Sequence, residues 1–295
     1  MKILKILFFI VVVNVCNAQM INGIVKDSIT GKEIAFANVV LKNGKGTYSD
    51  EFGVFQLNVK QTLVDTLKIS TIGYKSKLLP VASLKKGIIF NIFLQPKTEF
   101  LDEVVISSKT IKYGKKEVLG EKRDGNIGVT SLIGMETAVF IANPKNKIGK
   151  VNGVYINLKK RKNAEYIATF NVKFYQYDSI RNSPGKLLYD ENLYVLPKNK
   201  KYRLWVDVKD FNIPFPKNGI CVGIEMVNTH GKVKKHTYFG PMFRYTFAED
   251  TVLKTWSNYH SRGWKDGYIE YKKYKRFKQG VSNPMIGAEV VYVLD

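Results

Sequence analysis

Short runs of alternating apolar and polar residues, broken by turn-forming residues about every 8–12 positions, constrain this chain more than any other feature. Phe55, Leu57 and Val59 alternate with polar residues, which is the pattern of a strand with one buried face. Asn43-Gly44 and Asp50-Glu-Phe-Gly53 supply the residues that tight turns require. The pattern predicts strands at Ile21–Lys26, Ile34–Leu41, Thr47–Ser49, Val54–Val59, Thr66–Thr71, Tyr74–Leu79 and Ile88–Leu94. Seven short strands in succession, without helical periodicity between them, predict an all-β sandwich.

The β pattern resumes with longer strands at about residue 127. On the stretch 166–177 we expect Phe170, Val172 and Phe174 on one face and Asn171 and Lys173 on the other. Further strands are predicted at Thr137–Ile141, Gly149–Leu158, Tyr166–Tyr177, Leu187–Val195, Lys201–Val208 and Ile220–Val227, with turns at Pro184-Gly185 and Lys198-Asn199. These lengths and the long connections favour a second, larger, jelly-roll-like sandwich over residues 127–295.

Two segments outside the sandwiches have their own composition. Residues 107–126 are rich in Lys, Gly and Glu, so we expect a flexible linker there in preference to a short helix at 115–122. Residues 1–18 resemble a cleavable secretory signal, because Lys2 and Lys5 precede an apolar run at 6–13 and Ala18 stands before Gln19. A lipid anchor on Cys16 and a buried N-terminal strand are the alternatives. No later segment is long and apolar enough to be a membrane-spanning helix.

Charge and cysteine content narrow the function classes. The net charge of +22 would suit an anionic partner such as lipopolysaccharide, an acidic glycan or nucleic acid, but the even spread of lysines favours a solvated basic surface. The basic and aromatic run at 271–278 resembles a single-strand nucleic-acid surface, yet an exported protein rarely meets nucleic acid, so we expect no such partner. Cys221 is the single cysteine after the leader, and its apolar neighbours predict a buried, inert thiol.

The first sandwich resembles a known family. The residues that carry the resemblance are Gly23-Ile-Val-Lys-Asp27, Thr30-Gly31, Ala37-Asn-Val39, Ser49-Asp50, Gly53-Val-Phe55 and Ile72-Gly73-Tyr74. Their order and spacing are similar to those of the carboxypeptidase-regulatory-like domain, and the match extends over residues 19–106. The resemblance implies a seven-stranded, transthyretin-like sandwich that serves as an accessory module without catalytic residues.

The remainder of the chain differs from the receptors in which that domain is found. Leu101-Asp-Glu-Val-Val-Ile106 resembles the segment that joins the domain to the plug of TonB-dependent outer-membrane receptors, but too few residues follow for a plug and barrel, so we do not expect a transport channel. The second half resembles an uncharacterised β-sandwich module of exported envelope proteins. That resemblance rests on Phe170-Asn-Val-Lys-Phe-Tyr175, Ser183-Pro-Gly185, Trp205-Val-Asp207, Val222-Gly-Ile-Glu225 and Trp264, and it implies no activity.

A search for catalytic and metal-binding motifs is negative. The chain has no Gly-x-Ser-x-Gly, His-Glu-x-x-His or Cys-x-x-Cys motif and no phosphate-binding glycine-rich loop. Asp207 or Asp210 could pair with Glu225 for hydrolysis, but strand-surface or lysine-paired carboxylates are favoured. The three histidines are His230, His236 and His260; His230 and His236 flank a basic tip that disfavours a cation, so they are expected at the surface and not as metal ligands. We therefore expect no catalytic residues, no cofactor and no metal.

Aromatic residues in the stretch 254–268 give the one positive functional signal. The candidate ligand-binding residues are Trp256, Tyr259, Trp264 and Tyr268, whose faces could stack on sugar rings or anchor loops in the core. We predict an exported, non-catalytic binding or interaction module in the periplasm or at the surface of a Gram-negative-type envelope. A carbohydrate-binding surface protein is the alternative, and an envelope hydrolase is a more distant one. The expected partner is a glycan or an outer-membrane protein.

Overall fold

The computed structural model describes residues 18–42, 45–60, 65–84, 87–97, 111–122, 124–228, 238–246, 254–267, 269–270 and 281–294. These residues form strands and two short 3-10 helices, η1 (Val81–Ser83) and η2 (Lys209–Phe211), and contain no α-helix. The predicted all-β class is confirmed. The expected signal peptide falls almost wholly on residues 1–17, outside the described residues.

Residues 18–97 form a sandwich of two sheets, which we call the N-terminal sandwich. One sheet has the strand order β4-β1-β7 and the other β3-β2-β5-β6. The strands are β1 (Ala18–Asp27), β2 (Asn38–Leu41), β3 (Gly46–Tyr48), β4 (Val54–Lys60), β5 (Thr66–Ser70), β6 (Lys77–Pro80) and β7 (Ile89–Leu94). The count of seven strands agrees with the prediction.

The core of the N-terminal sandwich follows the alternation in its strands. Phe55, Leu57 and Val59 of β4 are buried, and they pack with Val25 and Leu67 between the two sheets. The predicted strand 34–41 is shorter, because regular pairing begins only at Asn38. The chain before it bends at Phe36, whose φ is 55°.

Residues 111–294 build a second, larger unit, which we call the C-terminal sandwich. Its first sheet runs β14-β13-β18-β10-β21-β22, with β15 also paired to β13. Its second sheet runs β8-β25-β11-β20-β9, with β16 and β17 also paired to β11. The strands of the first sheet are β10 (Met135–Ile141), β13 (Thr169–Asp178), β14 (Ser183–Leu187), β15 (Leu193–Val195), β18 (Ile220–Val227), β21 (Thr255–Tyr259) and β22 (Trp264–Asp266).

The remaining strands complete this unit. The second sheet contains β8 (Glu117–Gly120), β9 (Ile127–Val129), β11 (Gly149–Lys159), β16 (Tyr202–Asp207), β17 (Pro214–Phe215), β20 (Met242–Tyr245) and β25 (Ile286–Tyr292). Two short pairs lie outside both sheets, namely β12 (Tyr166–Ile167) with β19 (Phe239–Gly240) and β23 (Ile269–Glu270) with β24 (Val281–Ser282). The main core lies between the two sheets, where Phe170, Val172 and Phe174 are fully buried on the predicted face of β13.

Three local expectations differ from the structure. Pro184-Gly185, expected as a turn, lies within the edge strand β14, where a proline is tolerated. The predicted strand 187–195 is divided between β14 and β15 by a loop. Residues 117–120 of the expected linker form β8, which pairs with β25, so the stretch 115–122 is not helical and part of the linker belongs to the second sheet.

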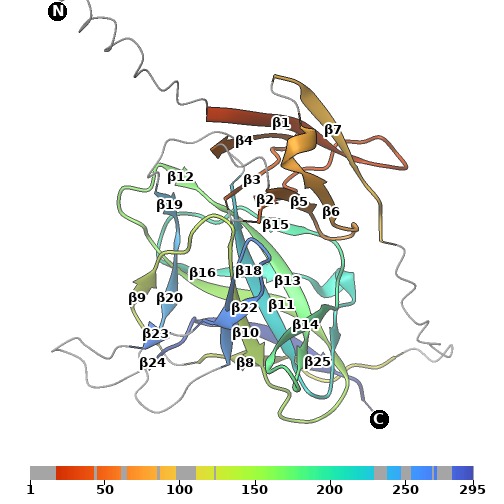
Figure 1. Ribbon diagram of the computed structural model, residues 1–295. Helices are drawn as coiled ribbons and strands as arrows, with labels where there is room; N and C mark the ends of the chain where they lie inside the picture. Colours follow the sequence, from red (N-terminus) through yellow and green to blue (C-terminus); the bar gives the residue numbers. More distant parts are fainter. Residues whose placement is uncertain are drawn as a thin grey trace, which may run out of the picture.

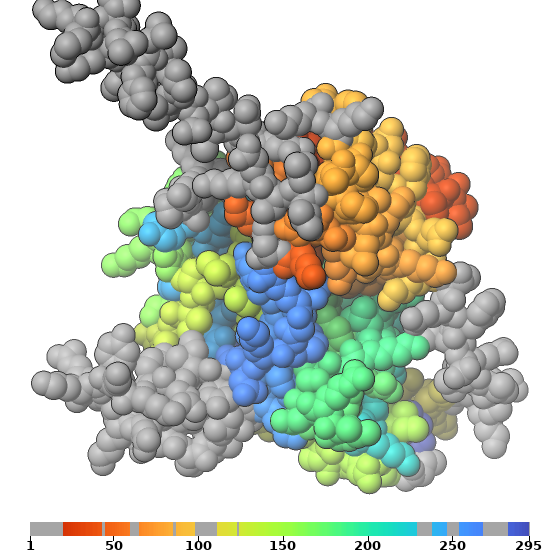
Figure 2. All heavy atoms as spheres, viewed as in Figure 1, coloured from red at the N-terminus to blue at the C-terminus, as the bar shows by residue number. Residues whose placement is uncertain are grey.

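The N-terminal sandwich sits on one side of the C-terminal sandwich (Figure 1). Its strands β2, β3 and β5 face β13, β15 and β18 of the first sheet below them (Figure 1). Figure 2 shows the orange residues of the N-terminal sandwich resting on the blue hairpin of β21 and β22. We call this contact region the junction, and the candidate site described next lies along it.

Candidate functional site

The face of the first sheet that points away from the core carries three buried charged side chains. Because Phe170, Val172 and Phe174 point into the core, Lys173 must lie on the outer face of β13. Strand β18 pairs with β13 and also with β10, and in the β10–β18 pair Glu136 and Glu225 occupy directly opposite positions. Like charges at opposite positions of paired strands are unfavourable unless a counter-charge lies between them.

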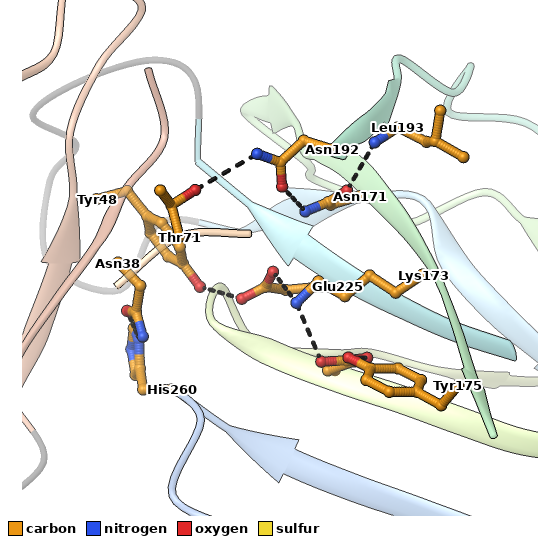
Figure 3. Close-up of polar contacts among 11 residues, drawn as sticks. Asn38, Tyr48, Thr71, Asn171, Lys173, Tyr175, Asn192, Leu193, Glu225 and His260 are labelled. Atoms are coloured by element: carbon orange, nitrogen blue, oxygen red, sulfur yellow. Dashed lines mark hydrogen bonds and ion pairs between the residues drawn. The ribbon is translucent and has the colours of Figure 1, made fainter. Parts of the chain in front are cut away.

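Lys173 supplies that counter-charge (Figure 3). Its Nζ lies 2.8 Å from Glu225 Oε2 and 3.2 Å from Glu136 Oε2. The Tyr175 hydroxyl donates to Glu136 Oε1 at 2.8 Å, and the Tyr48 hydroxyl donates to Glu225 Oε1 at 2.8 Å. Each carboxylate therefore has one ammonium and one phenol as partners, which is the arrangement that lets buried charges persist. We call these five residues the ion network.

The protonation states of the ion network follow from its burial. Burial raises the pKa of Glu136, Lys173 opposes that rise, and Glu225 adds to it. Burial acts to lower the pKa of Lys173, but the two carboxylates outweigh it and hold this pKa well above its ordinary value. Burial and the adjacent carboxylates raise the pKa of Tyr48 and of Tyr175. At neutral pH the lysine is therefore a cation and both phenols are neutral donors.

The N-terminal sandwich contributes directly to this face. Tyr48, the last residue of β3, makes the hydrogen bond to Glu225 across the junction. Asn38 Oδ1 of β2 lies 2.8 Å from His260 Nδ1 of the C-terminal sandwich. Asn192 Nδ2 donates to Thr71 Oγ1 at 3.4 Å (Figure 3). These polar contacts come from three separate positions of the N-terminal sandwich, so the two units meet over a broad surface.

Backbone conformations at the junction are unusual. Phe36, His260 and Ser261 have φ values of 55°, 50° and 55°, in the left-handed region. The other described non-glycine residues in this region are all asparagines, which tolerate it well. Phe36 is held there with its ring edge-on to Tyr194, at 4.9 Å between ring centroids. A strained conformation of this kind costs roughly 1–3 kcal/mol and persists only where the surrounding packing enforces it.

A cleft of about 260 Å³ opens at the junction, and we call it the junction cleft. It is lined by Phe36, Asn38, Tyr48, Lys68, Ser70, Thr71, Ile72, Tyr74, Ser76 and Lys97 from the N-terminal sandwich. From the C-terminal sandwich it is lined by Glu136, Asn171, Lys173, Tyr175, Leu187, Asn192, Glu225, Asn258, Ser261 and Trp264. A wider hollow of about 1050 Å³ adjoins the same junction and includes Arg161, Tyr259 and His260 in its wall.

The structure separates the four candidate aromatic residues. Trp256 is 3% exposed, and its indole N–H donates to the carbonyl oxygen of Asn182 at 2.9 Å, so it is a core residue. Trp264 is only partly buried, lies edge-on to Tyr175 and lines the junction cleft. Tyr259 is half-buried and lines the wider hollow. Tyr268 lies outside the described residues.

Among the described candidates, Asp207 and Glu225 do not come together as a pair of carboxylates. Asp207 is exposed on the second sheet beside Lys209, whereas Glu225 belongs to the first sheet. Cys221 is buried as predicted, and burial raises its pKa to about 12. His260 is buried, and its ring packs against Gly134 and Tyr48. His230 and His236 lie outside the described residues. Within the described ranges no three His, Cys, Asp or Glu residues cluster as metal ligands.

Glu136, Lys173 and Tyr48 were not predicted from the sequence as candidate site residues. Glu136 and Glu225 are each the one charged residue of a largely apolar strand, and a lone charge in a buried strand requires a partner. That signal could have identified the carboxylates. It could not have identified Tyr48, because nothing local in the sequence relates β3 to β18.

Comparison with known proteins bears on the N-terminal sandwich. Residues 21–106 match the family model described as CarboxypepD_reg-like domain. This part of the chain is a carboxypeptidase-regulatory-like domain. A stretch of 96 residues, 32% of the chain, is 44% identical to the TonB-dependent receptor SusC of Bacteroides thetaiotaomicron. The chain spans only 8% of that receptor's length.

The regulatory-like domain therefore supplies Asn38, Tyr48 and Thr71 to the junction. Their partners in the C-terminal sandwich are His260, Glu225 and Asn192, in that order. Residues 111–294 lie entirely beyond the match to the family model. In the part of the chain that the structure describes, no helix has the length and apolar character needed to cross a membrane.

Proposed function

We propose that this protein is exported to the cell envelope and acts there by binding, without catalysis, at the junction of the regulatory-like domain and the C-terminal sandwich. The observation that carries the proposal is the junction cleft, whose polar and aromatic lining comes from both units. The apolar run near the N-terminus and the likeness to part of a TonB-dependent receptor support an envelope location.

The ion network supports a binding role in preference to a catalytic one. A pair of carboxylates in a cleft would suit hydrolysis if one could donate a proton and the other attack or activate water. Here a single ammonium lies between Glu136 and Glu225, and a phenol occupies a further oxygen of each. Groups with this many fixed partners stabilise the junction, and little of either carboxylate is left to reach a substrate.

Site-specific crosslinking in cells tests this function. A photoreactive amino acid would replace Lys97, an exposed residue that lines the junction cleft. A matched control would carry it at Ile180, which is 95% exposed and does not line the cleft. We expect the protein in the envelope fraction and one defined adduct from position 97 that position 180 does not form. Equal adducts from both positions, or a cytoplasmic protein, would contradict the proposal.

A carbohydrate ligand is the second candidate. Trp264 offers an aromatic face, and Asn258 and Ser261 offer amide and hydroxyl groups at the same cleft. A glycan array probed with the purified protein tests this version. Specific signals that Trp264→Ala removes would support it, and a blank array would count against it.

A further inference from the structure

The junction cleft has two walls that come from different units. Ser70 and Thr71 line it from the regulatory-like domain, and Asn258, Ser261 and Trp264 line it from the C-terminal sandwich. Neither unit alone contains the complete cleft. The regulatory-like domain is therefore placed to contribute directly to recognition and not only to act as an accessory.

The chemistry of these walls matches that of a sugar. Hydroxyl and amide side chains both donate and accept hydrogen bonds, as the hydroxyls of a sugar require. The partly buried indole of Trp264 offers an apolar surface to the C–H face of a ring. The volume of about 260 Å³ lies just below the roughly 300–1,000 Å³ of pockets for drug-sized ligands, which suits a single ring.

The charges around the cleft nearly cancel. The ion network places Glu136, Glu225 and Lys173 at the cleft, and Lys68 and Lys97 stand at its regulatory-like wall. Two carboxylates thus face three ammonium groups, and the two carboxylates are already paired with Lys173. A ligand without a full charge fits this balance better than a strongly acidic one.

The walls are also held in place before a ligand arrives. Phe36 and Ser261, one on each side of the cleft, both have a left-handed backbone conformation that the surrounding packing holds in place. The hydrogen bond from Tyr48 to Glu225 holds the two units together directly beside it. A site whose walls are fixed in advance loses less conformational freedom on binding.

We infer that the junction cleft binds one neutral sugar ring of a glycan, with Trp264 against the ring and hydroxyl or amide groups of both units on its edge. The inference rests on the proposed binding function and makes it more specific. It names the site and the ligand class, and it assigns one wall of the site to the regulatory-like domain.

Calorimetric titration of the purified exported protein tests the inference. The probes are methyl glycosides of neutral hexoses, of an N-acetylhexosamine and of a hexuronic acid. We expect a neutral glycoside to bind best. Trp264→Ala should weaken that binding about tenfold, and Ser70→Ala, on the opposite wall, should weaken it about threefold. Trp264→Phe keeps an aromatic ring and should retain part of the affinity. This conservative variant keeps the test valid if the alanine variant does not fold.

Matched controls lie outside the cleft. Trp205→Ala removes an indole from the second sheet, and Ser83→Ala removes an exposed hydroxyl from the regulatory-like domain; neither should change affinity. Sugar binding that survives both cleft substitutions would overturn the site, and tighter binding of the hexuronate would overturn the ligand class. If no glycoside binds, this inference fails, whereas the proposed function is judged separately, by the specific adduct from position 97 and by the envelope location of the protein.

Discussion

His260 is the titratable group most directly tied to the junction. Its side chain is 6% exposed, and its ring packs against Gly134 and Tyr48. Burial lowers its pKa from 6.5 to about 4; Glu225 opposes that shift and Arg262 adds to it. Since Nδ1 also meets Asn38 across the junction, the neutral ring is the form that fits the folded protein.

We expect the free energy of unfolding to depend on pH through this residue. The unfolded chain, in which the His260 pKa is near 6.5, takes up the proton first as the pH falls. The stability of the native state should therefore fall between pH 6.5 and about 4, by up to about 3 kcal/mol from this residue. Urea unfolding across this range would be compared with that of His260→Asn, since asparagine tolerates the left-handed backbone. The carboxylates of the protein titrate in both proteins, so the difference between the two pH profiles reports His260 alone. Parallel profiles would contradict the expectation.

Lys173 carries a second prediction at the residue scale. Lys173→Met leaves Glu136 and Glu225 opposite each other without a counter-charge, and breaking a buried ion pair in this way costs about 3–5 kcal/mol. Chemical denaturation at pH 7 measures the loss. Adding Glu136→Gln and Glu225→Gln to the same chain should recover part of it. The exposed Lys75→Met is the control and should change stability by less than about 0.5 kcal/mol.

The hairpin of β21 and β22 shows what individual elements contribute. The stretch 254–268 is rich in loop-forming residues, yet Thr255–Tyr259 and Trp264–Asp266 pair as antiparallel strands at the edge of the first sheet. Trp256 is buried against Ala138 and Cys221, while Trp264 reaches the junction cleft. One short hairpin thus supplies both a buried anchor and part of the wall of the junction cleft.

The two tryptophans of this hairpin should respond differently to substitution. Trp256→Ala removes a buried indole and the hydrogen bond to Asn182, and should lower stability by about 3–5 kcal/mol. Trp264→Ala, at a partly buried position, should cost less. Thermal unfolding of both variants provides the comparison. A melting temperature of Trp256→Ala close to that of the wild type would show that the indole is not a core anchor.

At the scale of the whole molecule, two hydrophobic cores are joined by a polar junction. The regulatory-like domain has its own cluster of buried residues, including Val25, Phe55 and Leu67. The C-terminal sandwich has a separate one between its sheets. The junction between them is held by Tyr48, Asn38 and Thr71 and by aromatic contacts. Because each unit has its own core, we expect the junction to add to the stability of each unit and not to replace either core.

We therefore predict that residues 19–106 fold when expressed alone. A cooperative thermal transition and a dispersed amide spectrum would establish this. In the full chain the same domain should melt at a higher temperature, because the junction stabilises it, and Tyr48→Phe should reduce that difference by removing the bond to Glu225. A fragment without a cooperative transition would contradict an independent core. Identical melting of the fragment and the full chain would contradict a stabilising junction.

The strands and their inward faces followed from the sequence, because alternation along a strand is a local property with a period of two residues. Phe55 and Phe170 are buried as that alternation predicts. Only the tertiary structure decided that the polar face of β13 is buried as well. That burial depends on Tyr48 meeting Glu225 across 177 positions of the chain, which no local pattern encodes. The separation of Trp256 from Trp264 has the same origin: both belong to one hairpin, but the packing of two sandwiches determines which indole enters a core and which lines a cleft.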